Sequence, residues 1–220
     1  MAADISLAEN LSAFERYLEN ERPVTALAYR KLIDRLSRAN AGNAAPGVGE
    51  HLPAFRLPDE CGKLLGSDQL LTDGPLVISL NRGHWCGFCV RELAALQSIN
   101  SEVRLLGGRI VAITPERQRF AGQLKAQSGL EFPVLSDVDN GYALSIGLAI
   151  WCGEEIKAIY AGIGFDLALY QGNPGGLLPI PATFVVAADG RISGRYVDVD
   201  FRRRMAPDDI LTVLRNTVQP

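Results

Sequence analysis

The chain has 220 residues, of which 47% are hydrophobic and 21% are charged, and its formal net charge at pH 7 is −3. This composition predicts a globular protein and excludes the basic surface that a nucleic acid or an anionic membrane would require. No apolar run approaches the roughly 18 residues of a membrane span, and the first residues lack the basic and apolar regions of a secretory signal. We therefore expect a cytoplasmic protein with no nucleic-acid and no membrane partner.

The N-terminal segment has the pattern of two amphipathic helices. Apolar residues, Leu27 among them, recur at near-helical intervals between residues 7 and 36, with Ser6 as a candidate N-cap and Pro23 at the start of a second helix. The stretch 40–49 is rich in Gly, Ala and Asn and is typical of a linker. The sequence thus predicts a helical hairpin and linker over residues 1–49 and a second domain over residues 50–220. Such a hairpin either covers a sheet or pairs with the same element of a second subunit, and we expect a homodimer.

Strands and helices alternate in the second domain. Residues 76–80 form a short apolar run, which is typical of a strand buried on both faces. Residues 89–106 carry a single apolar stripe, which predicts one helix that the glycine pair 107–108 would end. Residues 110–113 are the next predicted strand. The run Thr114-Pro115-Glu116 offers an N-cap, a first-turn proline and an acid, and predicts a helix that extends to about residue 129.

The rest of the domain predicts an antiparallel hairpin and a closing helix. Residues 133–136 read as a short strand, and the strands 183–187 and 192–199 flank Asp189-Gly190, a tight-turn signal. A last helix is predicted from about Pro207. A parallel βαβ half, an antiparallel hairpin and a C-terminal helix indicate an α/β protein with a thioredoxin-like fold, in which helices flank a central mixed sheet.

The strongest chemical signal is the Cys-x-x-Cys of Cys86 and Cys89, which falls where a buried strand gives way to a helix. A thiol at a helix N-terminus faces unpaired backbone N–H groups and the positive end of the helix dipole, both of which stabilise a thiolate. Cys86 is nearest that end, so we expect it to be the more acidic and more exposed thiol. Cys89 lies one turn later on the apolar stripe and should be buried. These positions predict that Cys86 attacks and Cys89 resolves.

A zinc site is the alternative interpretation of this motif, because His84 precedes the two cysteines at ligand spacing. The other cysteines, Cys61 and Cys152, do not form a second pair, and we interpret them as ordinary thiols. Redox chemistry without a metal or another cofactor is therefore the favoured interpretation.

Several segments resemble the peroxiredoxin-like branch of the AhpC/TSA family. They are Leu52–Asp59, Gly62-Lys63, Gly74–Leu93, Leu135–Asp137, Pro181–Val186, Asp189–Ile192 and Asp198–Arg204. The resemblance runs from about residue 50 to about residue 215 and leaves the N-terminal hairpin uncovered. It implies a thioredoxin-like fold and a thiol-dependent antioxidant oxidoreductase that reduces peroxides. It also implies an electron donor such as a thioredoxin- or glutaredoxin-type protein or a small thiol.

The chain departs from that family around the reactive cysteine. Peroxide-reducing members typically carry a proline and a Thr or Ser where this chain has Ser79 and Gly83, and an arginine where it has Pro181. A proline at that place is similar to thioredoxin-type disulfide reductases, in which its peptide bond is commonly cis, although a proline can also simply begin a strand. The alternatives are therefore a dithiol-disulfide oxidoreductase that acts on protein or small-molecule disulfides and, more distantly, a non-catalytic module that binds a partner or a metal.

Four further positions are candidate supports for the thiolate or the substrate pocket. Arg82 and His84 are close enough in sequence to add positive charge, although both are also ordinary loop residues. Trp85 either shields the sulfur or packs beside it, and Pro181 is the fourth. The triplet Arg202–Arg204 is typical of a solvated surface, and the alternative is that one of these arginines reaches a substrate carboxylate or a partner.

Overall fold

The structure is a computed structural model, and it describes residues 5–218. The α-helices are α1 (Leu7–Glu21), α2 (Pro23–Arg38), α3 (Ser67–Leu71), α4 (Gly87–Ser98), α5 (Asn100–Leu105), α6 (Gln118–Gln127), α7 (Gly141–Ser145), α8 (Glu154–Gly162), α9 (Leu167–Gln171) and α10 (Pro207–Val218), and a 3-10 turn, η1, covers Val138–Asn140. The strands are β1 (Arg56–Pro58), β2 (Leu64–Gly66), β3 (Leu76–Leu80), β4 (Arg109–Thr114), β5 (Val134–Ser136), β6 (Ala149–Trp151), β7 (Leu177–Pro179), β8 (Ala182–Val186) and β9 (Ile192–Val197). No helix within residues 5–218 is both long enough and apolar enough to cross a membrane.

A five-stranded mixed sheet forms the centre of the protein, with the strand order β5-β4-β3-β8-β9. β3 pairs with β4 in parallel, as β4 does with β5, whereas β8 runs antiparallel to both β3 and β9. Every residue of β3 is buried, as expected for the apolar run at 76–80. The prediction of a thioredoxin-like mixed sheet is confirmed.

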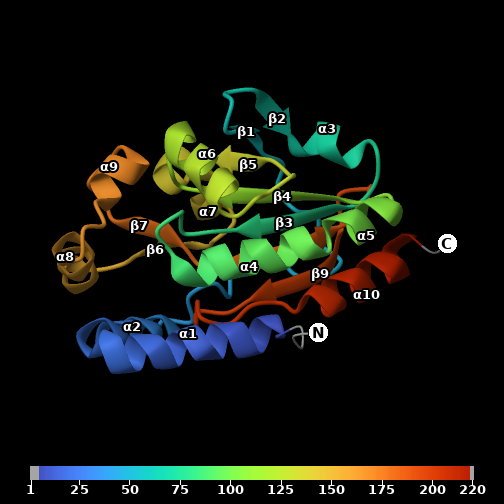
Figure 1. Cartoon of the computed structure of the whole chain (residues 1–220). Helices are drawn as coiled ribbons and strands as arrows, with labels where there is room; N and C mark the ends of the chain where they lie inside the picture. Colours follow the sequence, from blue (N-terminus) through green and yellow to red (C-terminus); the bar gives the residue numbers. More distant parts are fainter. Residues whose placement is uncertain (1–4, 219–220) are drawn as a thin grey trace.

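Helices cover both faces of this sheet, as Figure 1 shows. Because side chains alternate along a strand, Val77 of β3 points into a core shared with α4, α5, α6 and α10, and Ile78 points into the opposite core with α3 and α7. Two further antiparallel pairs, β1-β2 and β6-β7, flank the main sheet. Their three-residue strands were not predicted, because segments this short carry no periodicity.

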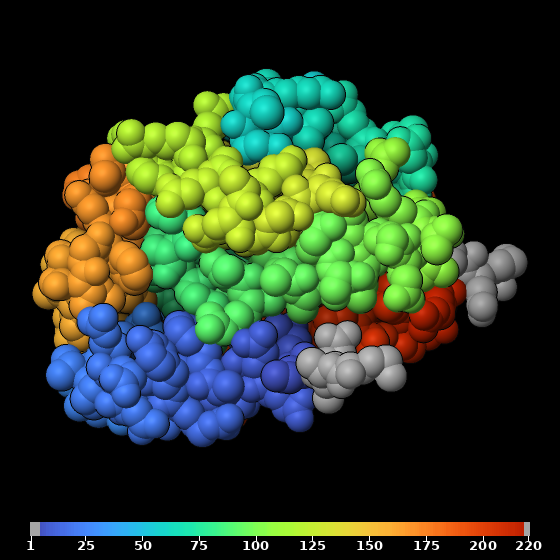
Figure 2. Space-filling view, in the orientation of Figure 1, coloured from blue at the N-terminus to red at the C-terminus, as the bar shows by residue number. Residues whose placement is uncertain are grey.

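The N-terminal hairpin packs against the end of the sheet to which β3 leads. α1 lies along α4 and α2 contacts α8, so the hairpin and the 154–171 region border the same part of the surface (Figures 1 and 2). A third apolar cluster fills this corner; it contains Leu11, Tyr29, Leu32, Trp85, Cys86, Phe88, Cys89, Tyr160 and Phe201 among others. The hairpin therefore covers the cysteine motif, which the sequence patterns did not predict.

The predicted first residues of the two hairpin helices are confirmed. The Ser6 hydroxyl accepts a hydrogen bond from the Glu9 backbone N–H at 3.3 Å, and the Glu9 carboxylate accepts one from the Ser6 N–H at 3.0 Å, so a complete capping box begins α1. Pro23 is the first residue of α2. Leu27 shares the helical spacing of the other apolar residues, but it is 48% exposed.

Two predicted helix boundaries are also wrong. The stripe at 89–106 belongs to two helices, because Ile99 leaves helical geometry (φ −97°, ψ 0°) between α4 and α5. The next helix, α6, begins at Gln118 rather than at Pro115, and the predicted N-cap, Thr114, is the last residue of β4. Glu116 is fully buried and turned toward the cysteine loop, so it does not serve as an exposed acid in a first helical turn.

Candidate active site

Cys86 lies where the central strand of the sheet gives way to α4. β3 ends at Leu80, the loop 81–85 follows, and Cys86 is the N-cap of α4 with extended backbone geometry (φ −84°, ψ 102°). The Cys86 carbonyl accepts a hydrogen bond from the Val90 N–H at 3.0 Å, which starts the helix. The thiol therefore sits at the positive end of the α4 dipole.

The two thiols of the motif lie together below the surface. The sulfur atoms of Cys86 and Cys89 are 2.7 Å apart, and Cys89 donates a hydrogen bond to Cys86. The prediction that Cys89 is buried is confirmed, since none of it is exposed. Cys86 is the more exposed of the two thiols, as expected, although only 4% of it is exposed beneath the N-terminal hairpin.

Arg82 places a buried guanidinium in an aromatic cage beside the thiols. Its central carbon lies 4.0 Å from the centre of the Phe201 ring, and its Nη2 donates a hydrogen bond of 2.5 Å to the Tyr160 hydroxyl. Tyr160 in turn donates to the Tyr29 hydroxyl at 3.1 Å. Within the described part of the chain no carboxylate pairs with Arg82, and the nearby groups that favour its charge are these tyrosines and the two cysteines. The thiolate of Cys86 is therefore the anion that can balance this buried cation.

A second buried cation, Arg204, reaches Cys89 from the segment after β9. Its Nη2 lies 3.6 Å from the Cys89 sulfur, and its Nε donates to the Glu92 carboxylate at 2.5 Å. The other Glu92 oxygen accepts hydrogen bonds from the hydroxyls of Ser79 (3.2 Å) and Thr183 (3.3 Å). The buried carboxylate thus has partners on both oxygens, and it holds the guanidinium under the second sulfur.

This ion pair was not predicted from the sequence. The prediction of a solvated surface for Arg202–Arg204 is wrong for Arg204, because its side chain is 1% exposed. The position of Glu92 in α4 could have indicated this pair, because Glu92 directly precedes Leu93 of the apolar stripe. A buried acid almost always has a charged or polar partner. Ser79, which stands where the resembling family has a proline, also acquires a role as a donor to Glu92.

These charges make the two thiols differ in acidity. Burial on its own raises the pKa of Cys86, but the hydrogen bond from Cys89 and the positive charges of Arg82 and Arg204 outweigh it and lower that pKa from 9.0 to about 6. Burial, the hydrogen bond to Cys86 and the negative charge on Cys86 raise the pKa of Cys89 well above its ordinary value. At neutral pH Cys86 is therefore mainly a thiolate and Cys89 a thiol, in agreement with the expected order of acidity.

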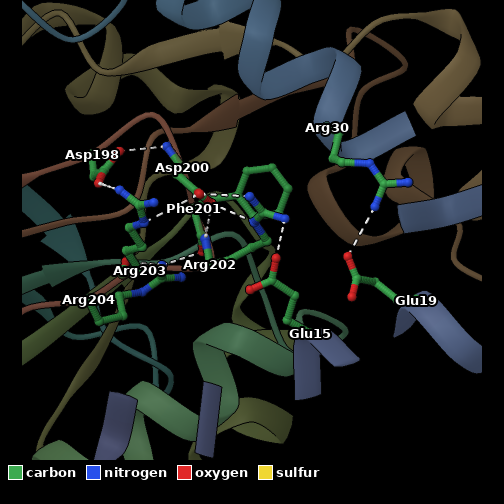
Figure 3. A network of polar contacts seen from close by, with 9 residues as sticks. All are labelled: Glu15, Glu19, Arg30, Asp198, Asp200, Phe201, Arg202, Arg203 and Arg204. Carbon is green, nitrogen blue, oxygen red and sulfur yellow. Dashed lines mark hydrogen bonds and ion pairs between the residues drawn. The ribbon is translucent and has the colours of Figure 1, made fainter. Parts of the chain in front are cut away.

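Arg202 of the triplet ties α1 to the site, as Figure 3 shows. Its guanidinium donates two hydrogen bonds to Asp200, at 2.7 and 2.8 Å, and one to Glu15 of α1 at 2.5 Å. Arg203 lies 3.7 Å from the Asp198 carboxylate and is 69% exposed, as the sequence interpretation expected. The network links the hairpin to the segment that supplies the buried cation.

The loop before the cysteines is held by the buried carboxylate of Glu116. It accepts a hydrogen bond from the His84 backbone N–H at 2.8 Å, and its other oxygen lies 2.7 Å from His84 Nδ1. The His84 ring stacks on Phe120 with 5.2 Å between ring centres and meets Tyr170 edge-on at 4.7 Å. The ring of His84 is thus engaged by Glu116 and two aromatic side chains, and the structure gives it no contact with either sulfur.

Gly83 stands where the resembling family carries a hydroxyl residue, and the surrounding structure has no room for one. Its φ is +136°, and a Cβ atom would lie 2.6 Å from the Glu116 carboxylate and 2.7 Å from Trp85 Nε1. We expect Gly83→Thr to lower the free energy of unfolding by about 2–4 kcal/mol and to slow peroxide consumption. Urea denaturation and stopped-flow kinetics measure the two effects.

Gly129→Ala is the matched control for this prediction, because Gly129 also has a positive φ (+61°) but has open space around it. It separates backbone strain from the clash with Glu116. A stable Gly83→Thr variant that consumes peroxide faster than the wild type would contradict the steric argument.

Pro181 and Trp85 are both buried near the cysteine loop. β8 begins at Ala182, which pairs with Leu80 at the end of β3, so Pro181 lies at the same edge of the sheet as Arg82. Pro181 is buried and its peptide bond is trans, like every other peptide bond in residues 5–218, which corresponds to the strand-entry interpretation. Trp85 is 8% exposed and packs against Tyr160 with 4.8 Å between ring centres, as its packing interpretation predicted.

A cavity of about 240 Å³ leads to Cys86, and the N-terminal hairpin forms one of its walls. Its lining consists of Phe14, Tyr17, Leu18, Arg22, Thr25, Tyr29, Trp85, Cys86, Gly87, Phe88, Arg91, Ile163 and Phe165. The contact between the hairpin and the site was not predicted from the sequence. The segment around Ile163 and Phe165, after α8, was not assigned either.

The geometry also bears on the zinc-site alternative and on the interpretation of Cys61 and Cys152 as ordinary thiols. Within residues 5–218 no three side chains of His, Cys, Asp or Glu are grouped so that they could hold a metal ion, and His84 faces Glu116. Cys61 is exposed, Cys152 is buried, and both are free thiols. The arrangement around Cys86 and Cys89 therefore favours redox chemistry at this pair.

Comparisons with known proteins point in the same direction. Residues 48–195 match the model of the AhpC/TSA family. Among similar solved structures is the peroxidoxin BcpB from Mycobacterium tuberculosis, with 21% identity, a TM-score of 0.59 and coverage of 77% of this chain and 96% of that one. A mutant of the peroxiredoxin 6 of Arenicola marina has 16% identity, a TM-score of 0.59 and coverage of 77% and 72%.

A putative thiol:disulfide interchange protein DsbE from Chlorobium tepidum is similar as well. It has 16% identity, a TM-score of 0.52 and coverage of 79% of this chain and 99% of that one. No curated protein matches the chain. At these identities the solved structures establish the fold, which peroxiredoxins and thiol:disulfide interchange proteins share.

Proposed function

Because the chain belongs to the AhpC/TSA family and is a peroxiredoxin-like thiol oxidoreductase, we propose that it reduces peroxides through Cys86 and Cys89. One observation carries the proposal. Cys86 lies at a helix N-terminus, the charges of the buried Arg82 and Arg204 side chains lower its pKa, and a second thiol is 2.7 Å away. This arrangement provides a nucleophile, charges that stabilise it, and a resolving thiol within reach.

The reaction follows from the order of acidity of the two thiols. The Cys86 thiolate attacks one oxygen of the peroxide, the O–O bond breaks, and the leaving alkoxide or hydroxide takes up a proton to become an alcohol or water. Cys86 is now a sulfenic acid. The Cys89 sulfur attacks the Cys86 sulfur, the S–O bond breaks, water leaves with the Cys89 proton, and a Cys86–Cys89 disulfide forms. An external thiol donor then returns two electrons and two protons.

Arg204 has a specific part in the second step. It lies 3.6 Å from the Cys89 sulfur, so it can stabilise the thiolate that Cys89 becomes as it loses its proton. Arg82 and Arg204 together take the place of the single arginine that the family places before β8, where this chain has Pro181.

The donor, the assembly and the location belong to the proposal too. We expect a thioredoxin- or glutaredoxin-type protein or a small thiol as the electron donor. We also expect a homodimer whose subunits each consist of the hairpin and linker, residues 1–49, and a second domain, residues 50–220. The thiols would stay reduced in a reducing, cytoplasmic environment.

The proposal is tested by the products of one turnover. One equivalent of hydrogen peroxide should convert the reduced wild type into a Cys86–Cys89 disulfide, seen as a loss of two thiols and 2 Da in mass. Cys89→Ser should stop at a sulfenic acid on Cys86, which dimedone traps, and Cys86→Ser should consume no peroxide above buffer. Cys61→Ser is the matched control, because that cysteine is exposed and away from the site. An unchanged thiol count in the wild type would reject peroxide reduction.

A second function, dithiol-disulfide exchange, is favoured by Gly83, which supplies no hydroxyl to hold a peroxide and has no room for one. In that reaction the Cys86 thiolate attacks a disulfide, and Cys89 displaces the resulting mixed disulfide. The two functions separate in the Cys89→Ser variant. A mixed disulfide that forms much faster than the sulfenic acid would favour exchange, and the reverse order supports peroxide reduction.

A further inference from the structure

We propose that the N-terminal hairpin and Arg91 form a substrate subsite. This subsite selects small hydroperoxides that have an apolar body, above all an aromatic one, and one acidic group. This inference rests on the proposed function and names the class of peroxide. The hairpin lies outside the segment 48–195 that matches the family, so the subsite belongs to the part of the chain in which it differs from that pattern.

The walls of the cavity are mainly apolar. The side chains of Phe14, Leu18, Phe88 and Phe165 line it, and Trp85 borders Cys86. Its volume of about 240 Å³ lies below the roughly 300–1,000 Å³ of pockets for drug-sized ligands. The enclosed part of a substrate is therefore about the size of one ring, and apolar atoms there gain from burial.

The charged groups at the cavity are cationic. Arg22 and Arg91 line it, and its lining includes no acidic side chain. Within residues 5–218 neither arginine pairs with a carboxylate. Arg91 donates to the Asn10 amide oxygen at 2.9 Å and to the Gly87 carbonyl at 2.9 Å, and it lies over the Phe14 ring at 3.9 Å.

Two carboxylates of α1 have other partners. Glu15 binds Arg202 and Glu19 binds Arg30 at 3.1 Å, as Figure 3 shows. Glu21 directly precedes Arg22 in sequence but forms no ion pair with it within residues 5–218, so no ion pair compensates the charge of Arg22 or Arg91 there. An anionic group on the substrate would supply the missing partner.

The two residues between the cysteines, Gly87 and Phe88, pack against α1 of the hairpin. A Cβ atom on Gly87 would lie 2.4 Å from the Phe14 ring, so α1 can approach α4 this closely only because the residue after Cys86 is glycine. The next residue, Phe88, meets Phe14 edge-on with 4.9 Å between ring centres. The two residues between the cysteines thus fit the hairpin, which supports a role for α1 in the site.

The orientation of the substrate follows from charge. The Cys86 thiolate is negative, so an acidic group avoids it and the neutral O–O bond is the part that approaches the sulfur. The acidic group then lies toward Arg91, one turn along α4, and Arg22 at the start of α2. This orientation places the reacting bond and the recognised charge at opposite ends of the substrate.

The first test needs no peroxide. We expect the ratio of the Cys86 alkylation rate with iodoacetate to that with iodoacetamide to fall about tenfold when Arg22→Gln and Arg91→Gln are combined, because the anionic reagent loses its attraction. The ratio cancels any change in thiolate reactivity, which affects both reagents. Arg16→Gln is the matched control on the exposed face of α1. Arg91→Lys keeps the positive charge, so its ratio of iodoacetate to iodoacetamide rates should stay close to that of the wild type.

The second test uses single-turnover oxidation by cumene hydroperoxide bearing a para carboxylate and by its methyl ester. The wild type should prefer the acid, and the double variant should lose that preference. If the alkylation ratio falls but no peroxide is consumed, the proposed function fails while the subsite stands. If peroxides are consumed but both ratios are the same in all variants, the subsite is rejected while the proposed function stands.

Discussion

Arg82→Met should make Cys86 alkylation by iodoacetamide at pH 7 about 30-fold slower, because the Cys86 pKa would return toward the free value of about 8.5. The wild-type thiol, with a pKa of about 6, is mostly ionised at pH 7. Since a thiolate reacts and a thiol does not, the rate in the variant should rise with pH and approach the wild-type rate near pH 9.5. Stopped-flow alkylation between pH 5 and 10 measures both curves.

The same substitution should leave stability within about 2 kcal/mol of the wild type. A buried cation without a carboxylate partner is costly, and a methionine of similar length fills its place among the aromatic rings. Arg35→Met is the matched control, since Arg35 also lies over an aromatic ring, that of Trp151 at 5.7 Å, but on the far part of α2. A variant that keeps its midpoint near pH 6 would show that Arg82 does not stabilise the thiolate.

Arg204→Met should lower the free energy of unfolding by about 3–5 kcal/mol, because it leaves the Glu92 carboxylate buried with hydroxyl partners alone. The double variant Arg204→Met with Glu92→Gln should recover most of this loss, since a neutral amide costs less to bury. Urea denaturation of the two variants and the wild type measures the difference.

The loss in the single variant should depend on pH. Burial raises the pKa of Glu92, and the variant lacks the opposing charge of Arg204. A carboxyl whose folded pKa lies above its unfolded pKa favours the folded state at low pH and loses that contribution as the pH rises through the folded pKa. The deficit should therefore be smaller at pH 5 than at pH 8. Equal deficits at both pH values would contradict the account of a stranded carboxylate.

The sheet and the motif could be predicted from the sequence because each is a local pattern. The run 76–80 is apolar throughout and is β3 as predicted, and the hairpin around Asp189 and Gly190 joins β8 to β9. Cys86 follows β3 directly, so its place at a helix N-terminus was predictable as well. In each case the neighbours along the chain decide the structure.

The remainder of the site depends on residues that are distant in the sequence. Arg204 meets Glu92 across 112 positions, and Arg82 meets Tyr160 across 78. No periodicity relates such positions, since the topology of the sheet brings them together. The N-terminal hairpin was similarly interpretable as two helices, but its contact with α4 depends on Phe14 and Gly87, which fit together only in three dimensions.

Both proposed reactions require Cys86 to be a thiolate at neutral pH. The pH dependence of Cys86 alkylation by iodoacetamide, followed by mass spectrometry of the peptide that contains Cys86, tests it directly. A midpoint near pH 6 is the result that the two buried arginines and the Cys89 hydrogen bond predict. A midpoint between about pH 8 and 9, the range of a free cysteine, would contradict the account and favour a non-catalytic role for this fold.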